Sequence, residues 1–165
     1  MKKDSEEQQF EVFNSFGQQT NNFCWTLEKP ESTVSLGTRL TKKFPNLSIL
    51  LLNGPLGAGK TTLVKGIAKS LRIQEPITSP TFPLSQHYPF GTPPLIHLDL
   101  YRIEETKAAN EFFLQEEEEC KAMGALMIVE WPERLTLPMP DAWRGKLEYS
   151  SNNQSRLFHL IPPMN

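Results

Sequence analysis

The sequence lacks most features that mark secreted or membrane proteins. It has two cysteines in 165 residues, Cys24 and Cys120, which lie far apart and not at metal-ligand spacing. This argues against a disulfide framework and against a cysteine metal site. No apolar run approaches the ~20 residues of a membrane-spanning helix, and the N-terminus is polar rather than signal-like. We therefore expect a soluble cytoplasmic protein with free thiols and no membrane contact.

The sequence also has no excess of positive charge. Lys and Arg number 17 and Asp and Glu 19, which gives a formal net charge of −2 and a pI near 5.9. Strong binding to nucleic acid requires a dense face of Lys and Arg against the phosphates. Any contact with RNA is therefore expected to be indirect or weak.

Residues 1–22 and 23–165 differ in composition. The first segment is rich in Gln, Asn, Ser and Glu and predicts a flexible extension, because it has little apolar surface to offset the entropy of ordering. The second segment has the length of one ordinary domain with its own core. Apolar or alternating runs predict strands at 23–27, 48–52, 95–100, 125–129, 146–149 and 156–161.

Helical patterns alternate with these strands. One helix is expected to open at Pro30, a second follows residue 59, and a third covers about residues 104–122. The order predicts an α/β domain of the P-loop NTPase type, with a mixed, mainly parallel central sheet flanked by helices. The last two strands surround Ser-Asn-Asn-Gln and predict a C-terminal antiparallel hairpin.

Residues 54–61, Gly-Pro-Leu-Gly-Ala-Gly-Lys-Thr, fit the P-loop pattern G-x-x-x-x-G-K-[ST]. They lie between a predicted buried strand and a predicted helix, the context that a phosphate cradle requires. The glycines allow backbone N–H groups to converge on an anion, Lys60 can reach the β- and γ-phosphates, and the Thr61 hydroxyl is placed to ligate Mg²⁺. The segment predicts binding of a nucleotide with Mg²⁺.

Two predicted strands end in carboxylates, Asp99 and Glu130. In a P-loop fold, an acid at the carboxyl end of a neighbouring strand helps to hold the Mg²⁺ shell, as a Walker B element does. Glu130 would orient or deprotonate water near the γ-phosphate, or steady the metal. The alternative for both is a structural role. Asp99 would cap the turn after its strand, and Glu130 would be a solvated side chain at the end of its strand.

Several other residues near these motifs have two interpretations each. Thr81, in Ser-Pro-Thr-Phe-Pro, belongs either to a loop that senses the γ-phosphate or to a surface turn. Trp131 either shields the site from water or packs against the loop. Arg102 either stabilises phosphate charge or pairs with an acid on the long helix. His97, two residues before Asp99, is expected to make a supporting hydrogen bond rather than to ligate metal. The Glu116–Glu119 run is expected to be a solvated helix face.

Four motifs in this order resemble the TsaE (YjeE) family of bacterial P-loop ATPases over roughly residues 27–161. They are Gly-Pro-Leu-Gly-Ala-Gly-Lys-Thr-Thr from residue 54, Ser-Pro-Thr-Phe from 79, His-Leu-Asp-Leu-Tyr-Arg from 97 and Val-Glu-Trp-Pro-Glu-Arg from 129. The resemblance implies a Mg²⁺-dependent ATPase required for N6-threonylcarbamoyladenosine at position 37 of tRNAs that read codons beginning with adenine. It further implies that the protein does not transfer the threonylcarbamoyl group, and that ATP binding and hydrolysis to ADP reset a TsaB–TsaD complex between turnovers.

The resemblance also implies roles for single residues. Catalysis would involve Lys60, Asp99 and Glu130, and the metal would lie at Thr61, Asp99 and Glu130. Nucleotide binding would involve Pro30, Leu56, Gly57, Ala58, Gly59, Lys60, Thr61, Thr62, Thr81 and Trp131, with Pro30 beside the adenine. The chain departs from the family pattern at Asn110–Gln115, which has no glycine, and its acidic run is longer.

Two other functions fit the P-loop. A small-molecule kinase would need an acceptor pocket and usually a basic lid, and no arginine-rich lid segment is present in the sequence. A nucleotide-sensing adaptor would bind ATP without cleaving it appreciably.

Overall fold

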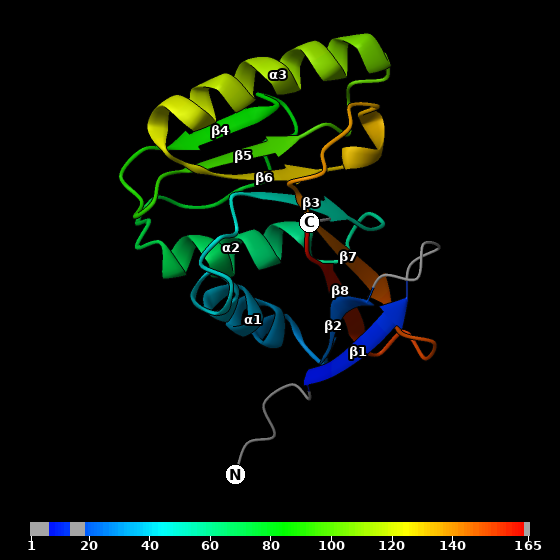
Figure 1. Ribbon diagram of the computed structural model, residues 1–165. Coiled ribbons are helices and arrows are strands. Elements are labelled where there is room, and N and C mark those ends of the chain that lie inside the picture. The colour runs from blue at the N-terminus through cyan, green and yellow to red at the C-terminus, as the bar shows by residue number, and fades with distance from the viewer. Residues whose placement is uncertain (1–6, 14–18, 164–165) are drawn as a thin grey trace.

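The computed structural model describes residues 7–13 and 19–163, which form one mixed sheet with helices on both faces (Figure 1). The strands are β1 (Glu7–Phe13), β2 (Gln19–Leu27), β3 (Ile49–Asn53), β4 (Ser85–Tyr88), β5 (Leu95–Asp99), β6 (Leu126–Glu130), β7 (Trp143–Tyr149) and β8 (Arg156–Ile161). The helices are α1 (Pro30–Lys43), α2 (Lys60–Ser70) and α3 (Thr106–Met123), with a 3₁₀ turn, η1 (Pro132–Arg134).

The sheet has the strand order β1-β2-β8-β7-β3-β6-β5-β4 in the described chain. The central pairs β7–β3, β3–β6 and β6–β5 are parallel, and the flanking pairs are antiparallel. The central strands β3, β5 and β6 are short apolar runs because helices cover both of their faces. Their carboxyl ends lie at one edge, where the loops after β3, β5 and β6 meet.

Alternate residues of these strands enter two separate cores. Leu50 and Leu52 of β3 pack with α1 and α2, whereas Leu51 packs on the other face with the cluster that includes Phe113 of α3. Figure 1 shows the same layers, with α1 and α2 on one side of the sheet and α3 on the other. Full burial of such a side chain stabilises the fold by about 1.5–3 kcal/mol.

Helices α1 and α2 cross at a close contact between Gly37 and Gly66. A Cβ atom added to Gly37 would lie 2.8 Å from the Gly66 Cα and 2.5 Å from the Leu63 carbonyl oxygen. Side chains larger than glycine would push the helices apart, so this pair sets the position of the P-loop helix against its neighbour.

The predicted fold class, the order of the helices and the C-terminal antiparallel hairpin are confirmed. The parallel part of the described sheet is its centre. The Asn110–Gln115 segment lies inside the continuous helix α3.

The expectation for residues 1–22 differs from the structure. Residues 7–13 form β1 and residues 19–22 begin β2, and the two strands pair antiparallel at the edge of the sheet. Low apolar content does not exclude an edge strand, because backbone hydrogen bonds to β2 hold it. Residues 1–6 and 14–18 of the predicted extension lie outside the described chain. The edge strand β4 was not predicted, since Ser-Gln-His-Tyr is short and largely polar.

Among the helices of the described residues, none combines the length and apolar character that a bilayer crossing requires. Cys24 and Cys120 are unpaired thiols, as their spacing predicts. Burial raises the pKa of both thiols, which keeps them protonated at neutral pH.

Candidate nucleotide site

The glycine loop joins the carboxyl end of β3 to the N-terminus of α2. Gly59 is the residue before the helix and has φ 102°, a conformation that favours glycine. Gly54 has φ 151°, and a Cβ atom there would lie 2.5 Å from the Leu147 carbonyl oxygen. The loop can therefore keep this shape only with glycine at both positions, and it directs the first N–H groups of α2 toward the adjoining cavity.

Lys60 is buried and turned onto its own loop. Its Nζ donates hydrogen bonds to the carbonyl oxygens of Gly54, at 2.6 Å, and Pro55, at 3.0 Å, and lies 4.2 Å from the centre of the Trp131 ring. Burial lowers the pKa of Lys60, and the charges of Glu130, Glu133 and Asp99 oppose that shift. The ammonium group is thus held at the floor of the loop by neutral acceptors and an aromatic face.

Asp99 and Glu130 are neighbours across the β5–β6 pair, in direct register, and each is only 3% exposed. The Thr61 hydroxyl donates to Glu130 Oε1 at 2.9 Å, and His97 Nε2 lies 2.9 Å from the same oxygen. The predicted supporting hydrogen bond of His97 is confirmed. Groups from two elements, α2 and β5, thus converge on one carboxylate oxygen of β6.

Asp99 holds the loop that contains Thr81. Its Oδ2 accepts hydrogen bonds from the hydroxyls of Ser79 and Thr81, each at 2.9 Å, and its Oδ1 accepts one from the Tyr101 backbone N–H, also at 2.9 Å. The loop is non-helical, residues 81–83 form a turn and Pro80 is buried. Thr81 is therefore connected to the carboxylate pair.

These groups line a cavity of about 430 Å³. Its walls come from the glycine loop, the start of α2, the Ser79–Thr81 loop and the ends of β5 and β6. The lining residues are Leu56, Gly57, Gly59, Lys60, Thr61, Thr62, Ser79, Thr81, Asp99, Tyr101, Glu130 and Trp131. Ten of the predicted site residues, Thr62 among them, line this one cavity.

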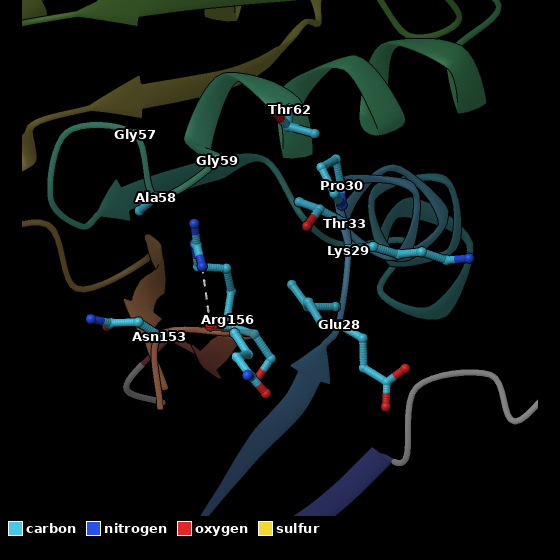
Figure 2. A pocket seen from close by; sticks show the side chains of 13 residues that line it. Glu28, Lys29, Pro30, Thr33, Gly57, Ala58, Gly59, Thr62, Asn153 and Arg156 are labelled. Carbon is cyan, nitrogen blue, oxygen red and sulfur yellow. Dashed lines mark hydrogen bonds between the residues drawn. The ribbon is translucent and has the colours of Figure 1, made fainter. Parts of the chain in front are cut away.

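A second cavity, of about 270 Å³, lies on the other side of the same loop. The two cavities share Gly57, Gly59 and Thr62 as lining residues. Figure 2 shows Pro30 and Thr33, from the start of α1, on one side and Asn153 and Arg156, from the β7–β8 hairpin, on the other, with the glycine loop above Asn153 and Arg156. The predicted residues Pro30 and Ala58 line this second cavity.

The β7–β8 hairpin supplies residues that the sequence does not reveal. Asn153, Gln154 and Arg156 line the second cavity. The Tyr149 hydroxyl donates to the Leu56 carbonyl oxygen at 3.2 Å, and the Arg156 guanidinium lies 4.0 Å from the centre of the Tyr149 ring. The polar Ser-Asn-Asn-Gln run indicates a turn, but nothing in it says that the turn lies beside the glycine loop.

Trp131 has φ 60°, which is rare for a bulky residue and is typical of functional sites. Its ring lies 4.8 Å from the Tyr101 ring. Arg102 does not line either cavity, and its guanidinium lies over the Phe82 ring at 4.1 Å. Neither interpretation proposed for Arg102 matches that contact.

The acidic run is not wholly solvated. The Glu116 carboxylate accepts a hydrogen bond from the Ser85 hydroxyl at 3.0 Å and lies 2.6 Å from His87 Nε2. Its side chain is only 12% exposed. For Glu116 the expectation of a solvated helix face is wrong, because the edge strand β4 packs against α3 at that position.

Comparisons with known proteins agree with one another. The family model described as threonylcarbamoyl adenosine biosynthesis protein TsaE matches residues 27–158. A curated tRNA threonylcarbamoyladenosine biosynthesis protein TsaE from Nostoc sp. is 44% identical over 136 residues, 82% of this chain and 83% of the relative. The protein of that name from Mycobacterium tuberculosis is 41% identical over 117 residues, 67% of this chain and 68% of the relative.

The solved structure of YdiB from Bacillus subtilis has the same fold. It superposes with a TM-score of 0.65, covers 88% of each chain and is 23% identical in sequence.

Proposed function

The chain belongs to the TsaE family of tRNA threonylcarbamoyladenosine biosynthesis, and from this premise we propose that it is a Mg²⁺-dependent ATPase of that pathway. Its ATP binding and hydrolysis would reset a TsaB–TsaD complex between turnovers without transferring the threonylcarbamoyl group. The observation that carries the proposal is the pair of cavities joined at the glycine loop. One nucleotide spanning both would have its phosphates beside Lys60 and Thr61 and its adenosine between Pro30 and the β7–β8 turn.

The donor groups of the first cavity suit Mg²⁺. Magnesium is usually bound by one or two carboxylates together with substrate phosphates and water, rather than by a full set of protein ligands. No group of three or more His, Cys, Asp or Glu side chains suited to a metal occurs in the described part of the chain. Thr61, Asp99 and Glu130 offer oxygen ligands at one edge of the sheet, so they would hold the ion together with the nucleotide. When bound, Mg²⁺ would neutralise charge on the phosphates.

The protein side chains have separate roles in this proposal. The loop N–H groups and the Lys60 ammonium bind phosphate oxygens, for which Lys60 must leave its bonds to Gly54 and Pro55. Glu130 accepts a proton from the attacking water or orients it. Its carboxylate is suited to this role because it lies at the C-terminal end of β6, next to β3 and the glycine loop that follows β3. Trp131 and Tyr101 exclude bulk water from the phosphates.

The rim of the first cavity supports a partner-coupled reaction. Leu56 is 74% exposed and Phe82 is 80% exposed. Leu56 belongs to the glycine loop, which lines the first cavity, and Phe82 belongs to the loop that is hydrogen-bonded to Asp99. Thr81 connects the Phe82 loop to Asp99. A change in that connection upon hydrolysis would move apolar side chains that a partner protein can cover.

ATP turnover measured with and without TsaB and TsaD tests the proposal. We expect slow Mg²⁺-dependent hydrolysis that responds to the partners. Glu130→Ala should lower turnover at least about a hundredfold, as loss of a general base does. Glu118→Ala, which removes an exposed carboxylate on α3, is the matched control and should leave turnover unchanged.

Other outcomes decide against the proposal. ATP binding without hydrolysis by the unaltered chain would favour the nucleotide-sensing adaptor. Transfer of phosphate to a metabolite would favour the kinase. Turnover indifferent to both partners would contradict the resetting role.

A further inference from the structure

Charge is distributed unevenly between the two helical layers. Residues 29–72 contain eight Lys and Arg and one acidic residue, Glu31, for a local net charge of +7. Residues 104–121 contain seven Glu and two Lys, for a local net charge of −5. The first segment contains α1, β3 and α2, and the second contains α3, which lies on the opposite side of the sheet from α1 and α2 (Figure 1). The overall charge of −2 conceals this separation.

The basic side chains of the α1–α2 layer face solvent. Lys60 is buried in the nucleotide site, whereas the other seven are exposed: Lys29, Arg39, Lys42, Lys43, Lys65, Lys69 and Arg72. Lys42, Lys65 and Lys69 make no ion pair with any other described residue. By contrast, Lys107 and Lys121 of α3 pair with Glu111 and Glu117. The positive charges of Lys42, Lys65 and Lys69 are thus available to an external partner.

The helices bring these charges together. A hydrogen bond of 2.8 Å joins the hydroxyls of Thr41 and Ser70, so the C-terminal ends of α1 and α2 lie side by side. Lys42 follows Thr41 and Lys69 precedes Ser70. Lys65 and Lys69 are one helical turn apart, on the solvent side of α2. Basic residues in a last helical turn also complement the helix dipole. That effect does not account for Lys65 or Arg39, which lie earlier, or for the near absence of acids.

We propose that the α1–α2 layer binds the phosphate backbone of RNA, with tRNA as the partner in this family's pathway. The choice of a polyanion over a protein rests on what the surface lacks. Protein interfaces have exposed aromatic or aliphatic anchors at their centre. Within the described residues, the exposed large hydrophobic side chains are Leu56, Phe82, Phe90, Tyr101, Leu114, Tyr149 and Ile161, and none belongs to α1 or α2.

The proposal predicts that the affinity of the chain for tRNA falls with salt. It also predicts that removing charges from α1 and α2 weakens binding more than removing charges elsewhere. The probe is an unmodified tRNA transcript, titrated with the full chain at about 50 and about 200 mM salt in the absence of ATP. In the triple variant Lys42→Gln, Lys65→Gln and Lys69→Gln, affinity at the lower salt should fall at least about tenfold. The slope of log K against log salt should become shallower by about one for each lysine that meets a phosphate in the unaltered chain.

A second triple variant controls for net charge. Lys107→Gln, Lys121→Gln and Lys146→Gln remove the same three charges from exposed positions outside the layer, and tRNA affinity should stay within about twofold, since charges far from the bound RNA are screened. ATP binding by both triple variants shows that the P-loop helix is intact.

Three results would overturn the proposal. One is no tRNA binding by the unaltered chain at low salt, and another is equal weakening by both triple variants. The third is a first triple variant that keeps tRNA affinity and loses association with an acidic protein, since the layer would then be a protein-docking surface. Because the titration contains no ATP, its result is independent of whether the chain hydrolyses nucleotide.

Discussion

His97 is completely buried and lies beside the carboxylate to which we assign water activation. Its Nε2 and the Thr61 hydroxyl both approach Glu130 Oε1 at 2.9 Å. Since a carboxylate oxygen accepts hydrogen bonds, this arrangement requires a proton on Nε2. Its Nδ1 then has no hydrogen-bond partner among the described residues. A side chain that leaves one nitrogen unpaired in order to hold Glu130 acts as a positioning residue.

Replacing His97 separates positioning from mere packing. His97→Leu removes the hydrogen-bond donor to Glu130. A hydrogen bond to a charged group contributes about 1.5–3 kcal/mol, so its loss corresponds to a fall in kcat of roughly 10- to 100-fold. The KM for ATP should change little, because His97 does not line either cavity. His97→Gln keeps an N–H donor and should recover part of kcat. If both variants lower the melting temperature equally and kcat not at all, His97 is only a core residue.

At this scale the sequence predicts which groups lie together beside the glycine loop, because they belong to local motifs. Gly59, Lys60 and Thr61 are set by one loop, and Asp99 and Glu130 by their place at strand ends. The partners of those groups are less accessible. That Ser79 donates to Asp99 across 20 residues depends on the path of a loop, which composition does not specify.

The β7–β8 hairpin is the element that joins the nucleotide loop to the far end of the chain. Tyr149 reaches the Leu56 carbonyl oxygen across 93 residues of sequence. The contact exists because β7 pairs with β3 in the sheet, which places the end of β7 next to the loop that follows β3. Gly57 has φ 75°, which favours glycine, and a Cβ atom there would lie 3.2 Å from the Tyr149 hydroxyl and press on it. The hairpin therefore supports the loop from the side of the second cavity.

Removing the Tyr149 hydroxyl should weaken ATP binding without affecting the chemical step. A neutral hydrogen bond contributes about 0.5–1.5 kcal/mol, so Tyr149→Phe should raise the Kd for ATP about two- to tenfold, as calorimetry can measure. Turnover at saturating ATP should be unchanged. Tyr88→Phe removes a hydroxyl outside both cavities and should leave the Kd unaltered. A lower kcat with normal Kd in Tyr149→Phe would assign the hairpin a different role.

The sequence predicts the hairpin itself, from alternation around polar turn residues, but not its neighbours. Strand order is set by which apolar faces pack best across the whole sheet, and no single strand carries that information. The edge strands show the same limit. β1 and β4 are largely polar and lack the apolar pattern that predicts a strand. Backbone pairing of β1 with β2 and of β4 with β5 holds them in the sheet.

At the scale of the whole molecule, the fold puts two different surfaces on opposite sides of one sheet, with the nucleotide loop at the edge between them. Helix α2 belongs both to the phosphate site, through Lys60 and Thr61, and to the basic layer, through Lys65 and Lys69. One helix of 11 residues therefore carries both sets of side chains. Composition alone predicts weak RNA contact because it averages charges that the fold separates.

The nucleotide should stabilise the whole domain, since its two cavities draw on elements from both ends of the chain. A ligand at about 100 times its Kd adds about 2.7 kcal/mol to the free energy of unfolding. For a chain of this size, 1 kcal/mol corresponds to about 2–4 °C, so ATP with Mg²⁺ should raise the melting temperature by about 5–10 °C. Lys60→Ala should abolish most of that rise, and EDTA should reduce it, whereas Lys65→Gln, on the same helix but outside the cavities, should retain it. A melting temperature indifferent to ATP and Mg²⁺ would contradict nucleotide binding at the glycine loop, and with it the assignment of Asp99 and Glu130 to the phosphate chemistry.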